Sequence, residues 1–294
     1  MDRPDPSEGS FKNNFDWALE ETEKVEVRLV EVLKPRIFAV PLLLGLVPNA
    51  TRRISTEIAA PTAQDTCAVF HASRVFTDAM GTFILLRKGL WVQTTSLTRN
   101  MLESVAQAIA LMCNPEMAEA WLEGRRFSPG QVRKRLSGKP DFGPLYSALS
   151  AIAHANPEGR WAHSVPVVGT LGVAISYGGT YQPKTAARSL AVLVDLILIY
   201  LQEFYGYYSN RLSISNWPIV IELGRSMNEE LRRWAESLPE DWEELQPHLP
   251  RLVPAPMPPS VLDQETVDRM LASMLEHRNN CSRGSCSGED GSAA

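Results

Sequence analysis

The chain has 294 residues, of which 44% are apolar and 21% charged, and this balance is typical of a globular protein with a sizeable core. Its formal net charge of -5 gives no overall attraction to polyanions, so RNA or DNA is disfavoured as a partner unless a local basic patch binds it. Four cysteines are too few for a disulfide framework. Cys67 and Cys113 lie in apolar helical stretches and are expected to be buried.

The N-terminal residues 1–10 are polar and acidic and lack the features of a signal peptide. The longest apolar runs, residues 37–48 and 190–201, are both shorter than the roughly 20 residues that span a bilayer. We therefore expect both runs to be core segments of a cytoplasmic protein without a membrane partner.

Apolar residues at helical spacing, punctuated by proline and glycine, predict helices along most of the chain. The expected long helices cover about 13–34, 61–89, 91–113, 143–156, 184–210 and 218–237, with a buried irregular segment or short helix at 37–48 and a short helix at 239–245. On the second of these helices we expect an apolar side made of Val69, Phe70, Phe76, Met80, Phe83 and Leu86. The fold class predicted is all-α, an antiparallel helical bundle.

Two short helices are indicated by their capping residues. Asn114 and Pro115 are typical of a helix start, and Gly124 of its end. Ser128 and Pro129 repeat this signal, with Gln131 completing a capping box and a glycine ending the helix at position 138. The sequence therefore predicts one helix at 115–124 and another at 129–138.

The remaining segments differ in composition from the helices. Alternating apolar residues at 171–177, preceded by residues 164–169, predict a small β-hairpin insert in which Pro166 confines its strand to an edge. The resulting domain division is a disordered N-terminus at 1–10, a helical bundle domain at 11–248, a proline-rich linker at 249–262, a tethered amphipathic helix at 263–278 and a disordered tail at 279–294.

Charged residues in apolar helices are the main candidates for function. Arg99 and Glu103 are four residues apart in the order that stabilises a helix less, by a few tenths of a kcal/mol at best. Asp195 lies within an apolar run and needs a cationic or hydrogen-bonding partner, for which Arg99 and His154 are the natural candidates. We expect a polar cluster of Arg99, Glu103, His154 and Asp195, which either fixes the packing of the helices or forms a ligand or catalytic site.

Residues 80–160 carry a pattern that resembles a group of uncharacterised bacterial helical proteins. The matching positions are Gly89, Leu90, Arg99, Glu103, Pro115, Tyr146, Leu149, Ser150 and His154. That group is distantly similar to the HEPN superfamily of helical bundles, whose active members are metal-independent ribonucleases of toxin–antitoxin and phage-defence systems. The resemblance implies an all-α protein of bacterial stress or phage defence.

The HEPN nuclease motif R-x4-6-H is absent, because no histidine is preceded by an arginine at that spacing. The leading expectation is therefore a non-catalytic interaction or regulatory protein that binds a protein partner or forms a homodimer. One alternative is a divergent ribonuclease in which His154 acts as general acid/base with Arg99, Glu103 or Arg160. Another is a bundle whose Arg99 cluster binds an anionic small molecule.

Other chemistries have weaker sequence support. Metal and nucleotide motifs such as E-x2-H, H-E-x-x-H and the P-loop are absent, so we expect no cofactor and no metal site. Cys281 and Cys286 form a lone C-x4-C pair without nearby metal-spaced histidines. One basic patch stands out, either as a solvated helix face or as a site for an acidic partner or an RNA backbone. It comprises Arg125, Arg126, Arg133, Lys134 and Arg135, with Lys139 nearby.

The predicted helix at 263–278 carries an apolar stripe on one side. Because a proline-rich segment precedes it, this helix can dock back on its own bundle or lie in the groove of a partner.

Overall fold

The computed structural model describes residues 10–34, 36–136, 142–153, 164–166, 173–175 and 179–239. Nearly all of these residues are helical, which confirms the all-α fold class. The helices are α1 (Ser10–Leu33), η1 (Arg36–Phe38), α2 (Ala39–Leu44), α3 (Leu46–Glu57), α4 (Ala63–Arg87), α5 (Trp91–Cys113), α6 (Pro115–Leu122), α7 (Pro129–Arg135), α8 (Gly143–Ala153), α9 (Pro183–Tyr208) and α10 (Trp217–Ser237).

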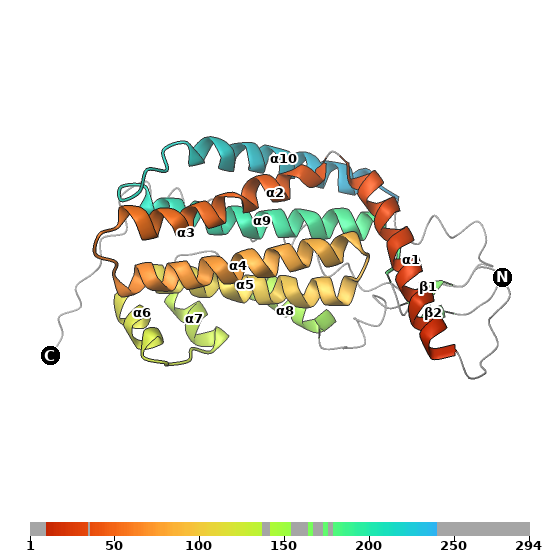
Figure 1. Cartoon of the computed structure of the whole chain (residues 1–294), viewed down its shortest axis with the longest axis horizontal. Coiled ribbons are helices and arrows are strands. Elements are labelled where there is room, and N and C mark those ends of the chain that lie inside the picture. Colours follow the sequence, from red (N-terminus) through yellow and green to blue (C-terminus); the bar gives the residue numbers. More distant parts are fainter. Residues whose placement is uncertain are drawn as a thin grey trace.

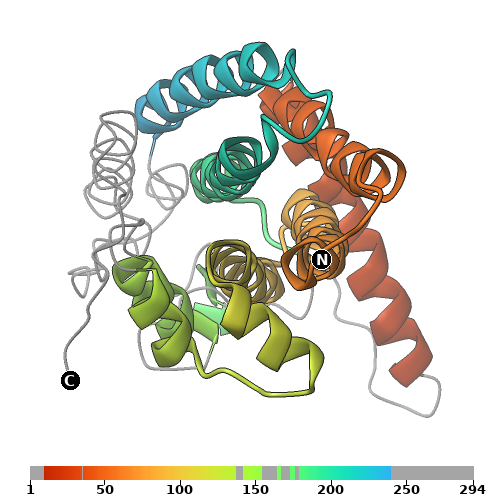
Figure 2. The ribbon, with the colours of Figure 1, turned by 90° about the vertical axis from the view of Figure 1, so that its left-hand side faces the viewer.

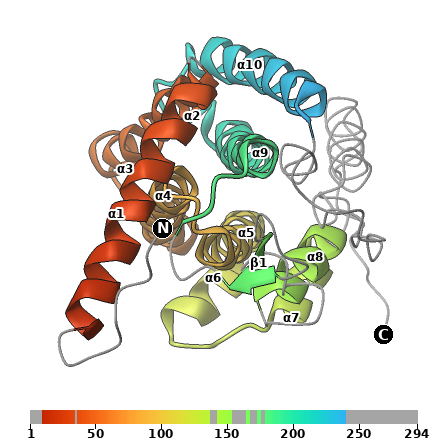
Figure 3. The same cartoon turned by 90° about the vertical axis from the view of Figure 1, so that its right-hand side faces the viewer.

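The long helices α4, α5, α9 and α10 run side by side (Figure 1). Seen along their length, α9 lies in the centre, with α10 on one side of it and α4 and α5 on others (Figure 2). Each residue from 191 to 201 of α9 is buried, as expected for a helix that is apolar all round. α1 is inclined steeply to the bundle, and α6, α7 and α8 lie on the side away from α10 (Figure 3).

The buried face of α4 is made largely of small side chains, and this corrects the predicted apolar side of α4. Phe70 and Met80, expected to be buried, are 59% and 42% exposed. The buried face is instead made of Cys67, Ala68, His71, Ala72, Val75, Ala79, Thr82 and Leu86. The approach of α5 is close at Gly81, where an added Cβ would lie only 2.8 Å from Leu97.

The segment expected to be irregular or a short helix forms two helices, α2 and α3, which meet at Gly45. Pro41 and Pro48 each occupy the third position of their helix, where the missing N–H has no intrahelical partner in any case. Only one side of α2 is buried, so Leu43 has no exposed surface while Leu42 is 40% exposed.

The turn from α4 to α5 is held by the residues that precede α9. Gly89 has a φ of +66°, and the Thr180 N–H donates a hydrogen bond of 3.1 Å to its carbonyl. Trp91 Nε1 donates to Thr180 Oγ1 at 2.6 Å. An added Cβ on Gly179 would lie 1.9 Å from the carbonyl oxygen of Lys88. Both glycines are therefore required by close backbone contact.

Two short strands, β1 (Ser164–Pro166) and β2 (Val173–Ile175), pair antiparallel with Val165 opposite Ala174. The residues between them lie outside the described part of the chain, so the β-hairpin insert stays a prediction. The predicted helix at 239–245, the linker, the tethered helix and the C-terminal tail also lie outside the described residues, as do residues 1–9.

Two helical stretches in the described chain are long and apolar enough to cross a membrane by length and composition, Arg36–Glu57 and Pro183–Tyr208. This is weak evidence, because core helices of soluble proteins pass the same test. The second stretch is 78% buried in its most apolar window, and the first is 39% buried.

Candidate interaction site

The basic patch lies on the α6–α7 loop and on α7. All five of its side chains, defined above as residues 125, 126 and 133–135, are exposed. α7 begins at a capping box, as predicted, in which Ser128 Oγ accepts from the N–H of Gln131 and Gln131 Oε1 accepts from the N–H of Ser128. Val132 and Leu136 are buried and attach α7 to α5. This anchoring leaves the basic side chains of the last turn in solvent.

None of the five basic side chains forms an ion pair within the described part of the chain, although Glu119 and Glu123 lie nearby in the sequence on and just after α6. Two of them contact aromatic rings instead. The guanidinium carbon of Arg125 lies 5.6 Å from the ring centre of Phe127, and that of Arg133 lies 5.9 Å from the ring centre of Tyr146. The positive charge of the patch is therefore not neutralised by neighbouring described carboxylates.

Arg99 and Glu103 form the pair that the sequence singled out, and Tyr146 of α8 completes it. Arg99 Nη2 lies 3.3 Å from Glu103 Oε1 and donates a hydrogen bond of 2.7 Å to Tyr146 Oη. The Arg99 guanidinium also lies 4.9 Å from the centre of the Tyr146 ring. Arg99 thus joins α5 to α8, which explains its place in the helix better than local helix stabilisation does.

Asp195 has the cationic partner that its burial requires. Among the described residues this partner is Arg232 of α10, and the candidate His154 lies outside the described residues. Asn228 Nδ2 also donates to Asp195 Oδ1, at 2.6 Å. Asn228 and Arg232 are four residues apart on α10, so both reach the same side of α9. The spacing of Asn228 and Arg232 on one side of α10 is a sequence feature from which the partners of Asp195 could have been predicted.

The four members of the predicted polar cluster have different described partners. Arg99 contacts Glu103 and Tyr146, whereas Asp195 contacts α10. His154 and Arg160 lie outside the described residues. The cluster and the catalytic roles assigned to its members therefore stay predictions.

Asp65 forms a second buried ionic centre, which the sequence did not indicate. Its carboxylate accepts two hydrogen bonds from Arg211, at 2.9 and 2.7 Å, and one from the Tyr208 hydroxyl at 2.9 Å. The N–H of Thr62 donates to it as well, within a capping box at the start of α4. Burial raises the pKa of Asp65, but these hydrogen bonds outweigh it and hold the pKa below its ordinary value. This centre ties the start of α4 to the end of α9.

His71 is buried on α4, and neither ring nitrogen has a hydrogen-bond partner among the described residues. Its ring lies 5.2 Å from that of Trp121. Burial, assisted by the charge of Arg74, lowers the pKa of His71 to about 4, so the imidazole is neutral at pH 7. His71 is therefore an apolar packing group under physiological conditions.

The two described cysteines differ in environment. Cys67 is buried as expected, and burial raises the pKa of its thiol to about 11, which makes it a poor nucleophile. Cys113 is exposed, contrary to expectation, because it is the last residue of α5. No group of His, Cys, Asp and Glu side chains suited to a metal ion occurs among the described residues.

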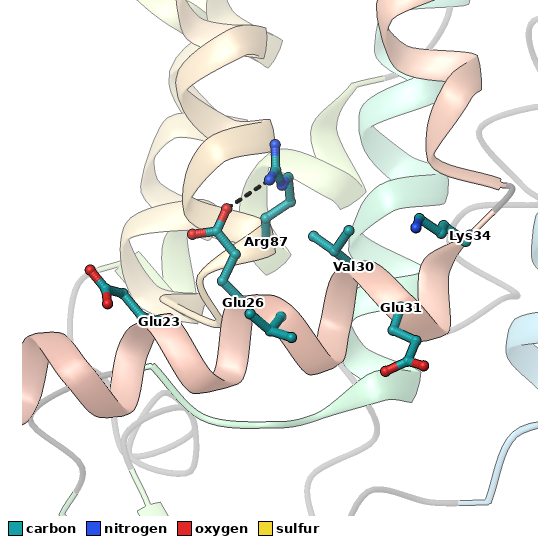
Figure 4. Close-up of a pocket in the computed structure, with 7 residues that line it drawn as sticks. Glu23, Glu26, Val30, Glu31, Lys34 and Arg87 are labelled. Atoms are coloured by element: carbon teal, nitrogen blue, oxygen red, sulfur yellow. Dashed lines mark ion pairs between the residues drawn. The ribbon is translucent and has the colours of Figure 1, made fainter.

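A shallow pocket of about 600 Å³ lies between α1 and the end of α4 (Figure 4). It is lined by Glu23, Glu26, Val27, Val30, Glu31, Lys34 and Arg87. Its main carboxylate, that of Glu26, already binds Arg87 at 2.8 Å and Lys88 at 3.1 Å. These two ion pairs link α1 to the end of α4.

Comparison of the chain with protein-family models, with curated proteins and with solved structures found no match. The features on which a function can rest are therefore the basic patch, the buried ionic pairs and the exposed apolar side chains.

Proposed function

We propose that this chain is a non-catalytic interaction module, HEPN-like as the sequence resemblance implies, whose basic patch binds an acidic segment of a protein partner. The observation that carries the proposal is the set of five exposed basic side chains without a described carboxylate partner. In a chain of net charge -5, such a local positive surface is suited to select acidic partners and to orient them.

The chemistry of the patch favours an acidic protein segment over RNA. Proteins that bind single-stranded RNA usually present free aromatic rings on which bases stack. Here Phe127 contacts Arg125, and Tyr146 contacts both Arg99 and Arg133, so each ring already has a cationic neighbour. Carboxylates need only the guanidinium and ammonium groups, which are exposed.

The roles of the residues that carry the family resemblance support a non-catalytic module. Gly89 is required by the turn between α4 and α5, and Arg99 and Tyr146 bind each other across α5 and α8. These contacts give each of the three residues a structural role that needs no substrate. A cytoplasmic setting in bacterial stress or phage defence belongs to the same proposal.

The test is binding of a fluorescently labelled poly-glutamate peptide, compared with a single-stranded RNA of equal charge. Replacing Arg133, Lys134 and Arg135 by alanine is expected to raise the Kd for the peptide roughly tenfold, because each exposed charge pair contributes about 0.2–1 kcal/mol. Arg52→Ala is the matched control, since Arg52 is also exposed and has no described ion pair but lies on α3. An unchanged Kd in the triple variant, or tighter binding of the RNA, would overturn the proposal.

A further inference from the structure

Four large apolar side chains are exposed on neighbouring parts of α10 and of the η1–α2 segment. Phe38 and Leu42 are 59% and 40% exposed, and Ile219 and Leu223 are 74% and 51% exposed. We call these four residues the α2/α10 surface. Within each pair the residues are four positions apart, which places them on one side of their helix. Exposed apolar side chains gathered in this way are typical of a surface that another element covers.

The two helices that carry this surface are held together by direct packing. An added Cβ on Gly224 would lie 2.7 Å from Leu43 Cδ2, so α10 approaches α2 as closely as a glycine permits. Leu42 and Leu223 are the sequence neighbours of this contacting pair. The exposed leucines therefore lie next to the line along which the two helices meet.

A polar contact at the far end of α2 fixes the same arrangement. The Arg36 guanidinium lies 4.2 Å from the ring centre of Trp234 and 3.8 Å from the carboxylate of Glu230. Both partners belong to α10. Because packing and a cation–π contact hold α2 against α10, the α2/α10 surface is formed before any partner binds.

The C-terminal part of the sequence contains a segment with complementary chemistry. Residues 263–278 have the periodicity of an amphipathic helix. The apolar stripe of this segment comprises Val267, Met270, Leu271, Met274 and Leu275. Methionine side chains adapt to irregular apolar surfaces, and two of the five stripe residues are methionine.

The length of chain between α10 and this segment permits its return to the surface. The described chain ends at residue 239, just after α10, and the proline-rich linker at 249–262 leads directly to the segment. An extended proline-rich chain covers about 3.1 Å per residue, so this linker alone can reach about 43 Å. α10, with 21 residues, is only about 30 Å long. A tethered segment also has an effective concentration near millimolar, which favours it over a second copy of the chain.

We infer that residues 263–278 dock as a helix on the α2/α10 surface of the same chain, with the methionines of the stripe against Leu42, Ile219 and Leu223. The proposal is independent of the basic patch, which lies on the opposite side of the bundle (Figure 2).

Disulfide trapping in the full-length chain tests the proposal directly. The variant Ile219→Cys with Met270→Cys is made in a background whose only other cysteine is the buried Cys67. We expect a disulfide within one chain. The matched control pairs Met270→Cys with Glu116→Cys on α6, and its disulfide should form much more slowly. A disulfide between two chains would show that a second copy occupies the surface and would overturn the inference, as would trapping no faster than in the control.

Hydrogen exchange of the full-length chain provides a second measurement that needs no cross-link. In the variant Met270→Asp with Met274→Asp, the amides of α2 and of the first half of α10 are expected to exchange several-fold faster than in the wild type. The variant Ala272→Asp with Ser273→Asp adds the same charge to the polar side of the segment and should leave these rates unchanged. Equal rates in all three proteins would contradict docking at this surface.

Discussion

The carboxylate of Asp195, in the middle of the most apolar helix, is bound by Arg232 of α10, and the two side chains are only 5% and 10% exposed. Asn228 donates a hydrogen bond to the same carboxylate. A charge in the centre of α9 is therefore tolerated because the neighbouring helix supplies both a cation and an amide donor. This pair fixes the position of α10 along α9.

Removing one member of the pair should destabilise the protein strongly. Arg232→Ala leaves a buried carboxylate without its cation, and we expect the free energy of unfolding to fall by about 3–5 kcal/mol. Urea denaturation followed by circular dichroism measures this change. Arg233→Ala, at the exposed neighbouring position, should change stability by no more than about 0.5 kcal/mol. Equal stability of the two variants would show that the buried pair is dispensable.

The Asp65 centre makes stability depend on acidic pH. Because the pKa of Asp65 is lower in the folded than in the unfolded chain, its ion pair stabilises the protein above the unfolded pKa of about 4. That stabilisation is lost as the pH falls through the folded-state pKa. In Asp65→Asn this part of the pH dependence should disappear. The free energy of unfolding at pH 7 should also fall, because the ion pair is lost. Urea midpoints measured from pH 7 to pH 3 test this, and parallel profiles for the two proteins would refute it.

Protonation of His71 should lower stability in a pH range above that in which the Asp65 ion pair is lost. The His71 pKa of about 4 in the folded chain lies below the ordinary value of 6.5, so between these values the unfolded chain binds a proton that the folded chain does not. The free energy of unfolding should therefore fall by 2–3 kcal/mol, to order of magnitude, as the pH drops from 6.5 to about 4. His71→Phe keeps an aromatic ring against Trp121 and should flatten the profile over this range. An unchanged slope in the variant would assign the pH dependence to other groups.

Gly89 and Gly206 should respond in opposite ways to alanine. Gly89 has a positive φ, and an added Cβ would lie 2.3 Å from the carbonyl oxygen of Thr180. We expect Gly89→Ala to lower the free energy of unfolding by about 1–3 kcal/mol or more, because alanine is strained in this backbone conformation. Gly206 lies within α9, where an added Cβ meets no atom within 4 Å, so Gly206→Ala should raise stability by up to about 1 kcal/mol. Thermal unfolding of both variants measures the difference, and a Gly89→Ala protein as stable as the wild type would contradict the role of this turn.

The ribonuclease alternative has a direct biochemical test. A non-catalytic module should leave structured RNAs intact during prolonged incubation with purified protein. His154→Ala is the variant to compare, since the ribonuclease alternative uses this histidine as its general acid/base. Cleavage by the wild type that is lost in His154→Ala would replace the proposed function by RNA hydrolysis.

Local sequence signals were sufficient for most of the helix boundaries. The proline at position 115 and the positive-φ glycine at position 124 mark the two ends of α6, and the capping box at Ser128 marks the start of α7, whereas α7 ends at Arg135, before the predicted end at 138. These signals act within one or two turns of backbone, so they do not depend on the rest of the fold. The apolar character of α9 likewise predicted its central position.

The buried side of α4 could not be determined in this way. Large residues such as Phe70 predicted that one side of α4 is buried, but packing in the folded chain buries a side made largely of alanine, cysteine and threonine. Such a choice depends on the shape of a helix that follows later in the chain, which the local pattern does not contain.

The sequence by itself determined the all-α class, many of the helix boundaries and the need of Asp195 for a partner, because each depends on neighbouring residues or on the cost of burying a charge. Only the tertiary structure decided that the partner is Arg232, that Arg99 binds Tyr146, and that Asp65 binds Arg211. These contacts join residues 37, 47 and 146 positions apart, and packing of whole helices brings them together.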